Sequence, residues 1–167
     1  HWGTEYSSKA SSYQKKWAEA MTEAGADVII GTHPHVVEPV EWITAENGNE
    51  ALCYYSLGNY VSSQKKAISI LEALAWVTFH VTEDDITIDR EHTGALPLVC
   101  QYTAGPVRFQ NVYLLEDYTE DLAASHGIRN YGGVTLRLED LQKWSTETLG
   151  DFVLTKDQVL HNFKLPH

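Results

Sequence analysis

Two histidines separated by one residue, His33 and His35, are the first candidates for chemistry in this chain. Imidazole binds zinc, manganese, iron and nickel alike, so the pair predicts a metal site without identifying the metal. Pro34 between them stops regular structure, which places both histidines on a loop. The loop follows the apolar run Val28–Ile30, and open α/β sheets bind ligands at the carboxyl ends of such strands. Without that position, the spacing alone would indicate a surface or structural pair.

The first six residues, His-Trp-Gly-Thr-Glu-Tyr, form a second candidate cluster. Gly3 permits a tight turn or a close approach of the backbone. The carboxylate of Glu5 is able to hydrogen-bond an imidazole that holds a metal. Taken alone, these residues favour a plainer interpretation, a frayed terminus whose aromatic pair packs on the core.

A helix and a buried strand are predicted to precede the histidine pair. Apolar residues within 10–24 fall on one side of a helix. Ser11 or Ser12 is suited to cap its start, and Gly25 lies just past its end. The run 26–30 predicts a short strand whose continuous apolar character indicates burial on both faces. A helix followed by such a strand is typical of the α/β class.

Hairpins and a further group of elements are predicted downstream. Apolar runs at 36–43 and 51–57 flank an Asn47-Gly48 turn, which predicts a hairpin. The other predicted elements are a hairpin from 74–82 to 86–90, strands at 96–103 and 107–115, and helices at 119–125 and 138–149. We expect residues 151–167 to form an extended or poorly ordered tail.

The composition indicates a globular and strongly acidic chain. Its 167 residues are 43% apolar, which fits one domain or most of one. Twelve basic residues against 23 acidic ones give a net charge of −11, so the chain repels phosphate backbones and nucleic acid is disfavoured as a partner. Cys53 and Cys100 lie in apolar runs and are interpreted as buried thiols, with a single disulfide as the alternative.

Three motifs, taken in their order along the chain, resemble the CapA family. They are His-Trp-Gly-Thr-Glu-Tyr at 1–6, Ala-Gly-Ala-Asp-Val-Ile-Ile-Gly-Thr-His-Pro-His-Val-Val at 24–37, and Tyr-Ser-Leu-Gly-Asn-Tyr at 55–60. CapA proteins are bacterial capsule-synthesis proteins linked to poly-γ-glutamate, with a calcineurin-like metallophosphoesterase fold. The resemblance implies the C-terminal portion of such a protein, acting at the extracellular face of the bacterial membrane.

The resemblance also implies roles for particular residues. His1, His33 and His35 match histidines that help hold a two-metal centre, for which manganese, zinc or iron is expected. Glu5 and Asn59 are implied to lie beside these ligands or on the substrate side. Two neighbouring metal ions activate water and clamp the oxygens of a phosphoryl group. No catalytic residue is assigned.

The chain departs from the superfamily in its carboxylate ligands. The Asp-x-His, Gly-Asp and Gly-Asn-His-Asp/Glu elements of such sites do not occur in it, and we expect them before residue 1. Three imidazoles alone are able to form a single zinc site, so we expect weak or absent metal binding by this chain alone. The run 89–92 also offers ligand types, but its place beyond a hairpin indicates a solvated face.

The predicted fold is α/β, a fragment of a metallophosphatase-like α-β-β-α sandwich with a mixed sheet and hairpins. Residues 1–150 are expected to form the C-terminal part of a CapA-like domain, and 151–167 the tail. A sandwich without its N-terminal half leaves a sheet edge and apolar surface uncovered. We therefore expect that missing half as a partner, and self-association in its absence.

Three functions fit these observations. The first is a metal-dependent hydrolase, phosphoesterase-like and dinuclear in the complete protein, with the isolated chain inactive. The second is a non-catalytic extracellular module for the assembly, export or anchoring of an anionic polymer such as polyglutamate. The third takes His1 as a native N-terminus whose amine and imidazole chelate copper together with a second histidine.

Overall fold

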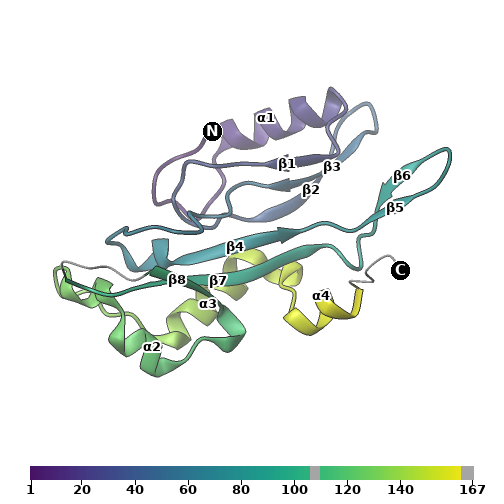
Figure 1. Cartoon of the computed structure of the whole chain (residues 1–167). Coiled ribbons are helices and arrows are strands. Elements are labelled where there is room, and N and C mark those ends of the chain that lie inside the picture. Colours follow the sequence, from purple (N-terminus) through teal and green to yellow (C-terminus); the bar gives the residue numbers. More distant parts are fainter. Residues whose placement is uncertain (106–109, 163–167) are drawn as a thin grey trace.

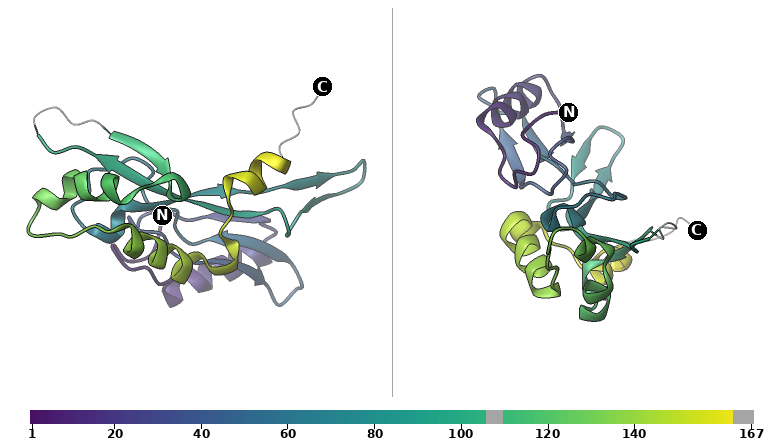
Figure 2. Two further views of the ribbon diagram at one scale, coloured as in Figure 1. Left: turned by 90° about the horizontal axis from the view of Figure 1, so that it is seen from below. Right: turned by 90° about the vertical axis from the view of Figure 1, so that its left-hand side faces the viewer.

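The structure, a computed structural model, describes residues 1–105 and 110–162. Four layers follow one another in Figure 1: one helix, a three-stranded sheet, a second three-stranded sheet and a group of helices. The end-on view in Figure 2 shows the two sheets stacked between the helices. This arrangement confirms the α/β class predicted from the sequence.

The first two layers come from the N-terminal third of the chain. They consist of α1 (Ser12–Glu23), β1 (Val28–Ile30), β2 (Val40–Thr44) and β3 (Glu50–Tyr54). Helix α1 begins with a capping box, in which the Ser11 hydroxyl accepts from the Gln14 N–H and the Gln14 side chain accepts from the Ser11 N–H. The strand order is β1-β3-β2, with β3 parallel to β1 and antiparallel to β2. The predicted first hairpin is therefore confirmed.

The other two layers come from the rest of the chain. The second sheet has the order β4-β7-β8, with β4 (Leu71–Trp76), β7 (Gly94–Tyr102) and β8 (Gln110–Leu114) all antiparallel to their neighbours. All nine residues of β7 are buried, because this strand is central in its sheet and covered on both faces. The helices are α2 (Glu120–Ser125), α3 (Leu138–Leu149), α4 (Lys156–Asn162) and the short 3-10 turns η1 (Ala67–Ile70), η2 (Leu115–Asp117), η3 (Gly127–Asn130) and η4 (Gly150–Phe152). Among the described residues, no helix has the length and apolar character that crossing a membrane requires.

A continuous apolar core joins the two sheets. Leu52 and Tyr54 of β3 belong to the same buried cluster as Leu71 of β4 and Val99 of β7. The Tyr54 hydroxyl donates to the carbonyl oxygen of Gly94 at 2.8 Å, so the cluster also contains a hydrogen bond from one sheet to the other. A buried hydroxyl without a partner is costly in such a core, so this bond helps to fix how the two sheets pack on each other.

The second predicted hairpin is present but shorter than expected. Strand β4 ends at Trp76, and the hairpin is formed by β5 (Phe79–Val81) and β6 (Ile86–Ile88), so the predicted strand 74–82 is in fact two. The hairpin projects away from the rest of the molecule (Figures 1 and 2). Of the predicted strand 107–115, the structure shows Gln110–Leu114; residues 106–109 lie outside the described residues.

Two further predictions differ from the structure. Strand β1 was expected to be covered on both faces, but Ile30 is 55% exposed because β1 lies at the edge of its sheet. The tail was expected to be extended, but it contains η4 and α4. Helix α4 forms because Thr155 and Gln158 cap it reciprocally and Val159 packs with Leu96 of β7. Residues 163–167 lie outside the described part of the chain.

The two cysteines are free and buried, which confirms the thiol interpretation and rules out the disulfide. Cys53 is on β3 and Cys100 is on β7, so they belong to different sheets. Burial raises the pKa of the Cys53 thiol to about 12 and also raises the pKa of Cys100.

Two carboxyl groups, those of Glu38 and Glu72, are fully buried, and Glu72 on β4 lies beneath the turn that follows β3. Its Oε2 accepts from the backbone N–H groups of Asn59 and Tyr60, and its Oε1 has no hydrogen-bond partner among the described residues. A Cβ at Gly58, whose φ is +80°, would collide with Glu72 Oε2, so this turn requires glycine. Burial raises the pKa of Glu72 from 4.5 to about 7.

This raised pKa predicts that the chain loses stability between pH 4.5 and about 7. The unfolded chain releases the Glu72 proton at the lower pH, whereas the folded chain holds it, so the contribution is complete below pH 4.5 and lost as the pH rises through about 7. The difference corresponds to about 3 kcal/mol in the free energy of unfolding. Urea unfolding at several pH values should show this slope, and Glu72→Gln should make it shallower. Burial also raises the pKa of Glu38, so that residue keeps a contribution of the same sign. The exposed Glu46→Gln is the control, and equal slopes in both variants would contradict the prediction.

Candidate functional site

A tryptophan joins the N-terminal segment to the loop after β1. The Trp2 indole Nε1–H donates to the carbonyl oxygen of Tyr55 at 2.8 Å, and the Trp2 backbone N–H donates to Thr32 at 3.0 Å. A Cβ at Gly31 would collide with both the Trp2 indole and the Tyr55 carbonyl oxygen. Glycine at this position therefore allows Trp2 to lie against the end of β1, and His1 is carried to the same place.

The structure brings the three predicted histidines into one neighbourhood. The ring centroids of His1 and His33 are 4.2 Å apart, and those of His33 and His35 are 6.2 Å apart. Among the described residues, however, no group of three or more histidine, cysteine, aspartate or glutamate side chains is arranged so that it could hold a metal ion. The proximity of the three rings is a finding, and their role as metal ligands stays a prediction.

The loop that carries His33 and His35 has an unusual backbone. His33 has a φ of +109° and His35 a φ of +60°, on either side of Pro34. Non-glycine residues in this region cost on the order of 1–3 kcal/mol each and cluster at functional sites. Tyr6, also at positive φ, donates its backbone N–H to the Pro34 carbonyl oxygen at 2.7 Å. The N-terminal segment thus helps hold the strained loop in place.

The side chain of Asn59 orients the His35 ring. Its Oδ1 lies 2.6 Å from His35 Nδ1, and its Nδ2 donates to the His35 carbonyl oxygen at 3.1 Å. The second bond fixes the amide, so its oxygen must face the ring and accept a proton from Nδ1. The neutral imidazole then carries its hydrogen on Nδ1 and presents the lone pair of Nε2. A hydrogen bond of this kind orients ligating histidines in metal sites.

Glu5 and Tyr6 flank the exposed side of the same ring. Glu5 Oε1 is 3.9 Å from His35 Nε2, and the Tyr6 ring stacks on the His35 ring at a centroid distance of 6.0 Å. Glu5 therefore lies beside the histidine that Asn59 orients, and its role there stays a prediction.

Two contributors to this arrangement were not predicted. Tyr6 was assigned no role beside His35, and Glu72 was assigned none beneath Asn59. Glu72 carried a signal, since it is a lone carboxylate inside the apolar run 68–81. Its partners are backbone N–H groups of a distant turn, so no side-chain motif identifies them.

The run 89–92 differs in part from the solvated face that was predicted. The Asp89 side chain is only 13% exposed, and its Oδ2 lies 3.0 Å from His80 Nε2 and 2.7 Å from His92 Nδ1. The hydrogen bond with His92 lowers the pKa of Asp89 and raises that of His92. These contacts close the base of the β5–β6 hairpin, which indicates a structural role.

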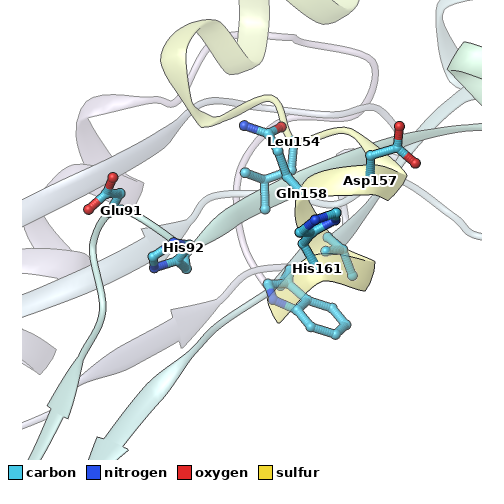
Figure 3. A pocket seen from close by; sticks show the side chains of 8 residues that line it. Glu91, His92, Leu154, Asp157, Gln158 and His161 are labelled. Atoms are coloured by element: carbon cyan, nitrogen blue, oxygen red, sulfur yellow. The ribbon is translucent and has the colours of Figure 1, made fainter. Parts of the chain in front are cut away.

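A hollow of about 400 Å³ lies next to this hairpin base and away from the three histidines. Figure 3 shows Glu91, His92, Asp157 and His161 around it, with Gln158 and Leu154. The side chains come from the segment after β6 and from α4 and its approach. The described residues around it do not form a group that could hold a metal ion.

Loss of the Asn59 amide should release the His35 tautomer. We expect Asn59→Ala to convert His35 from a single Nδ1–H form to a mixture of both neutral tautomers, because the acceptor facing Nδ1 is removed. Imidazole ¹⁵N NMR at a pH above the histidine titration range reads this directly. His126 is an internal control, since its Nδ1 accepts from Ile128 N–H and its Nε2 faces the Cys100 carbonyl oxygen. An unchanged His35 spectrum would refute the assigned role of Asn59.

Comparison with known proteins matches the part of the chain that carries the histidines. The family model described as "Bacterial capsule synthesis protein PGA_cap" matches residues 1–64. The "PGA biosynthesis protein CapA" of Bacillus subtilis (strain 168) is 47% identical over 64 residues, and the "Capsule biosynthesis protein CapA" of Bacillus anthracis is 44% identical over 64 residues.

These matches cover 38% of this chain, and 16% and 14% of the two relatives, so the chain spans a small part of their length. No solved structure matches it. The matched segment holds His1, His33, His35, Glu5 and Asn59, all in the sheet layer of β1-β3-β2 and its adjoining loops. Residues 1–64, which carry the histidines, are therefore similar to bacterial capsule synthesis proteins of the CapA kind.

Proposed function

We propose that this chain is part of a capsule biosynthesis protein in which His1, His33 and His35 contribute to a divalent metal site of the metallophosphoesterase kind. The observation that carries the proposal is the proximity of three imidazole rings, those of His33 and His35 on the strained loop and that of His1 beside His33. The hydrogen bond to Asn59 engages Nδ1 of His35 and leaves the Nε2 lone pair available. The left-handed conformations of His33 and His35 support the proposal, because strained residues of this kind cluster at functional sites.

The donor set fits a divalent cation only in part. Imidazole nitrogens suit zinc, manganese and iron, and Glu5 adds a carboxylate near His35. Bridging two cations needs carboxylates between them, and the described residues near the histidines do not supply these. We therefore propose that residues outside this sequence complete the site. When bound, two metal ions would activate water and clamp phosphoryl oxygens.

Zinc titration of the isolated chain tests the histidine part of the proposal. We expect at most one weakly bound ion per chain, because three imidazoles support a single site. His33→Ala and His35→Ala should each abolish that binding, measured by calorimetry. His80→Ala removes an exposed histidine from the hairpin base and should leave it unchanged. Tight binding of two ions, or equal binding by all three variants, would refute the proposed division of the site.

Hydrolysis by a longer protein that contains this sequence tests the activity. With manganese or zinc added, we expect cleavage of a generic phosphoester, and we expect His33→Ala to abolish it. The assay uses the natural protein at matched expression and folding, with His80→Ala as the control. Activity that persists in His33→Ala would show that these histidines are not part of the reaction centre.

A second candidate is a non-catalytic module at the extracellular face of the bacterial membrane that assembles, exports or anchors an anionic polymer. A chain with net charge −11 repels a polyanion, so this function needs a local basic site. The Lys66 ammonium group lies over the Tyr6 ring that stacks on His35, so a basic side chain is available there. Polymer binding that survives loss of both His33 and His35 would favour this candidate over the hydrolase.

A further inference from the structure

A hollow of about 440 Å³ lies beside the histidine neighbourhood and is lined mainly by hydrogen-bond donors. Its walls come from one residue of the N-terminal segment and from the segment between β3 and η1. They are Tyr6, Ser62, Ser63, Gln64, Lys65 and Lys66. Among the described residues, no aspartate or glutamate lines it, although the chain has 23 acidic residues and only 12 basic ones.

The two lysines of this hollow are not neutralised by carboxylates. Several basic residues elsewhere form ion pairs with carboxylates; they are Lys15, Arg90, Arg137, Lys143 and Lys156. Within residues 1–105 and 110–162, Lys65 and Lys66 form no such pair and instead lie over aromatic rings. Lys66 Nζ is 3.7 Å from the centroid of the Tyr6 ring, and Lys65 Nζ is 4.7 Å from that of Tyr131. A cation–π contact holds an ammonium group in place without cancelling its charge.

The backbone of this segment is tied to the rest of the molecule. The Ser62 N–H and carbonyl oxygen both contact the buried Cys100 Sγ of β7 at 3.3 Å. The Gln64 carbonyl oxygen accepts from the Tyr102 hydroxyl at 2.9 Å, and its side-chain oxygen accepts from the Tyr6 hydroxyl at 3.1 Å. The backbone that carries the donors of the hollow is therefore held in position before any ligand arrives, which reduces the entropy lost on binding.

Tyr6 connects the hollow to the histidines. Its ring stacks on His35 and also lies under the Lys66 ammonium group. An anionic group bound by the lysines would thus lie near the His35 ring. In a strongly acidic chain, two uncompensated lysines in one place concentrate the attraction for anions there.

We propose that Lys65 and Lys66, with the hydroxyl groups of Ser62 and Ser63, form a subsite for an oxyanion, a carboxylate or a phosphate, on the ligand that reaches the histidines. The inference rests on the proposed function only in one respect, namely that the ligand bound at the subsite also reaches His35. Ammonium and hydroxyl groups both donate to oxyanions, and the charged bonds are the stronger ones. No metal ion is needed for this recognition.

Anion titration of the metal-free chain tests the subsite. The probes are inorganic phosphate and a short glutamate oligomer, added in the presence of a chelator and followed by amide NMR shifts and calorimetry. We expect shifts centred on residues 62–66 and binding that weakens as salt is added. The double variant Lys65→Gln/Lys66→Gln should raise the Kd by at least about tenfold, because two charge-assisted contacts are lost. Tighter binding of the oligomer would identify carboxylates as the ligand groups, and tighter binding of phosphate would identify phosphoryl groups.

Matched variants separate this subsite from the metal site. Lys16→Gln removes an exposed lysine of α1 and should leave anion binding unchanged, and Lys66→Arg, which keeps the charge, should retain it. His33→Ala should abolish zinc binding without affecting anion binding by the metal-free chain. Anion binding that is lost in His33→Ala but kept in the double lysine variant would overturn the subsite. Failure of zinc to bind, with the lysine effect intact, would instead overturn the metal proposal alone.

Discussion

The contact between the Trp2 indole and the backbone at Gly31 is the constraint on which the arrangement of the histidines depends. The indole fits there because residue 31 has no side chain, and it is fixed by its hydrogen bond to the Tyr55 carbonyl oxygen. That carbonyl follows β3 directly, so the N-terminal segment, β1 and β3 meet at one point. Without this contact, His1 would have no reason to lie beside His33.

A second constraint reaches the site from the other sheet. The Glu72 carboxyl group on β4 holds the backbone of Asn59, and the Asn59 side chain in turn orients His35. The hydrogen bonds form a continuous path from the core of the second sheet to the ring that faces solvent. The matched family segment ends at residue 64, so part of the support for its histidines comes from a residue beyond it.

Local sequence patterns predicted most helices and strands. The features that they did not predict depend on contacts between residues far apart in the sequence. Helix α3 has the bounds expected for it, and the Asn47-Gly48 turn does join two strands, because both depend on residues close in the sequence. The exposure of Ile30 could not be read from its apolar run, since it depends on the order of strands in the sheet. Helix α4 depends on the distant Leu96. The same limit applies to the site, where motifs gave the residue types and only the folded backbone brought them together.

The reactivity of the two free thiols would report local opening of the folded chain. A protonated thiol is unreactive, and burial keeps both groups in that form at neutral pH. Cys53 lies beneath α1 in the first sheet, whereas Cys100 lies in the second sheet and holds the backbone of Ser62. Labelling of Cys53 would therefore follow the separation of α1 from its sheet. Labelling of Cys100 would follow the release of the lysine-bearing segment, so one alkylating reagent distinguishes two local motions.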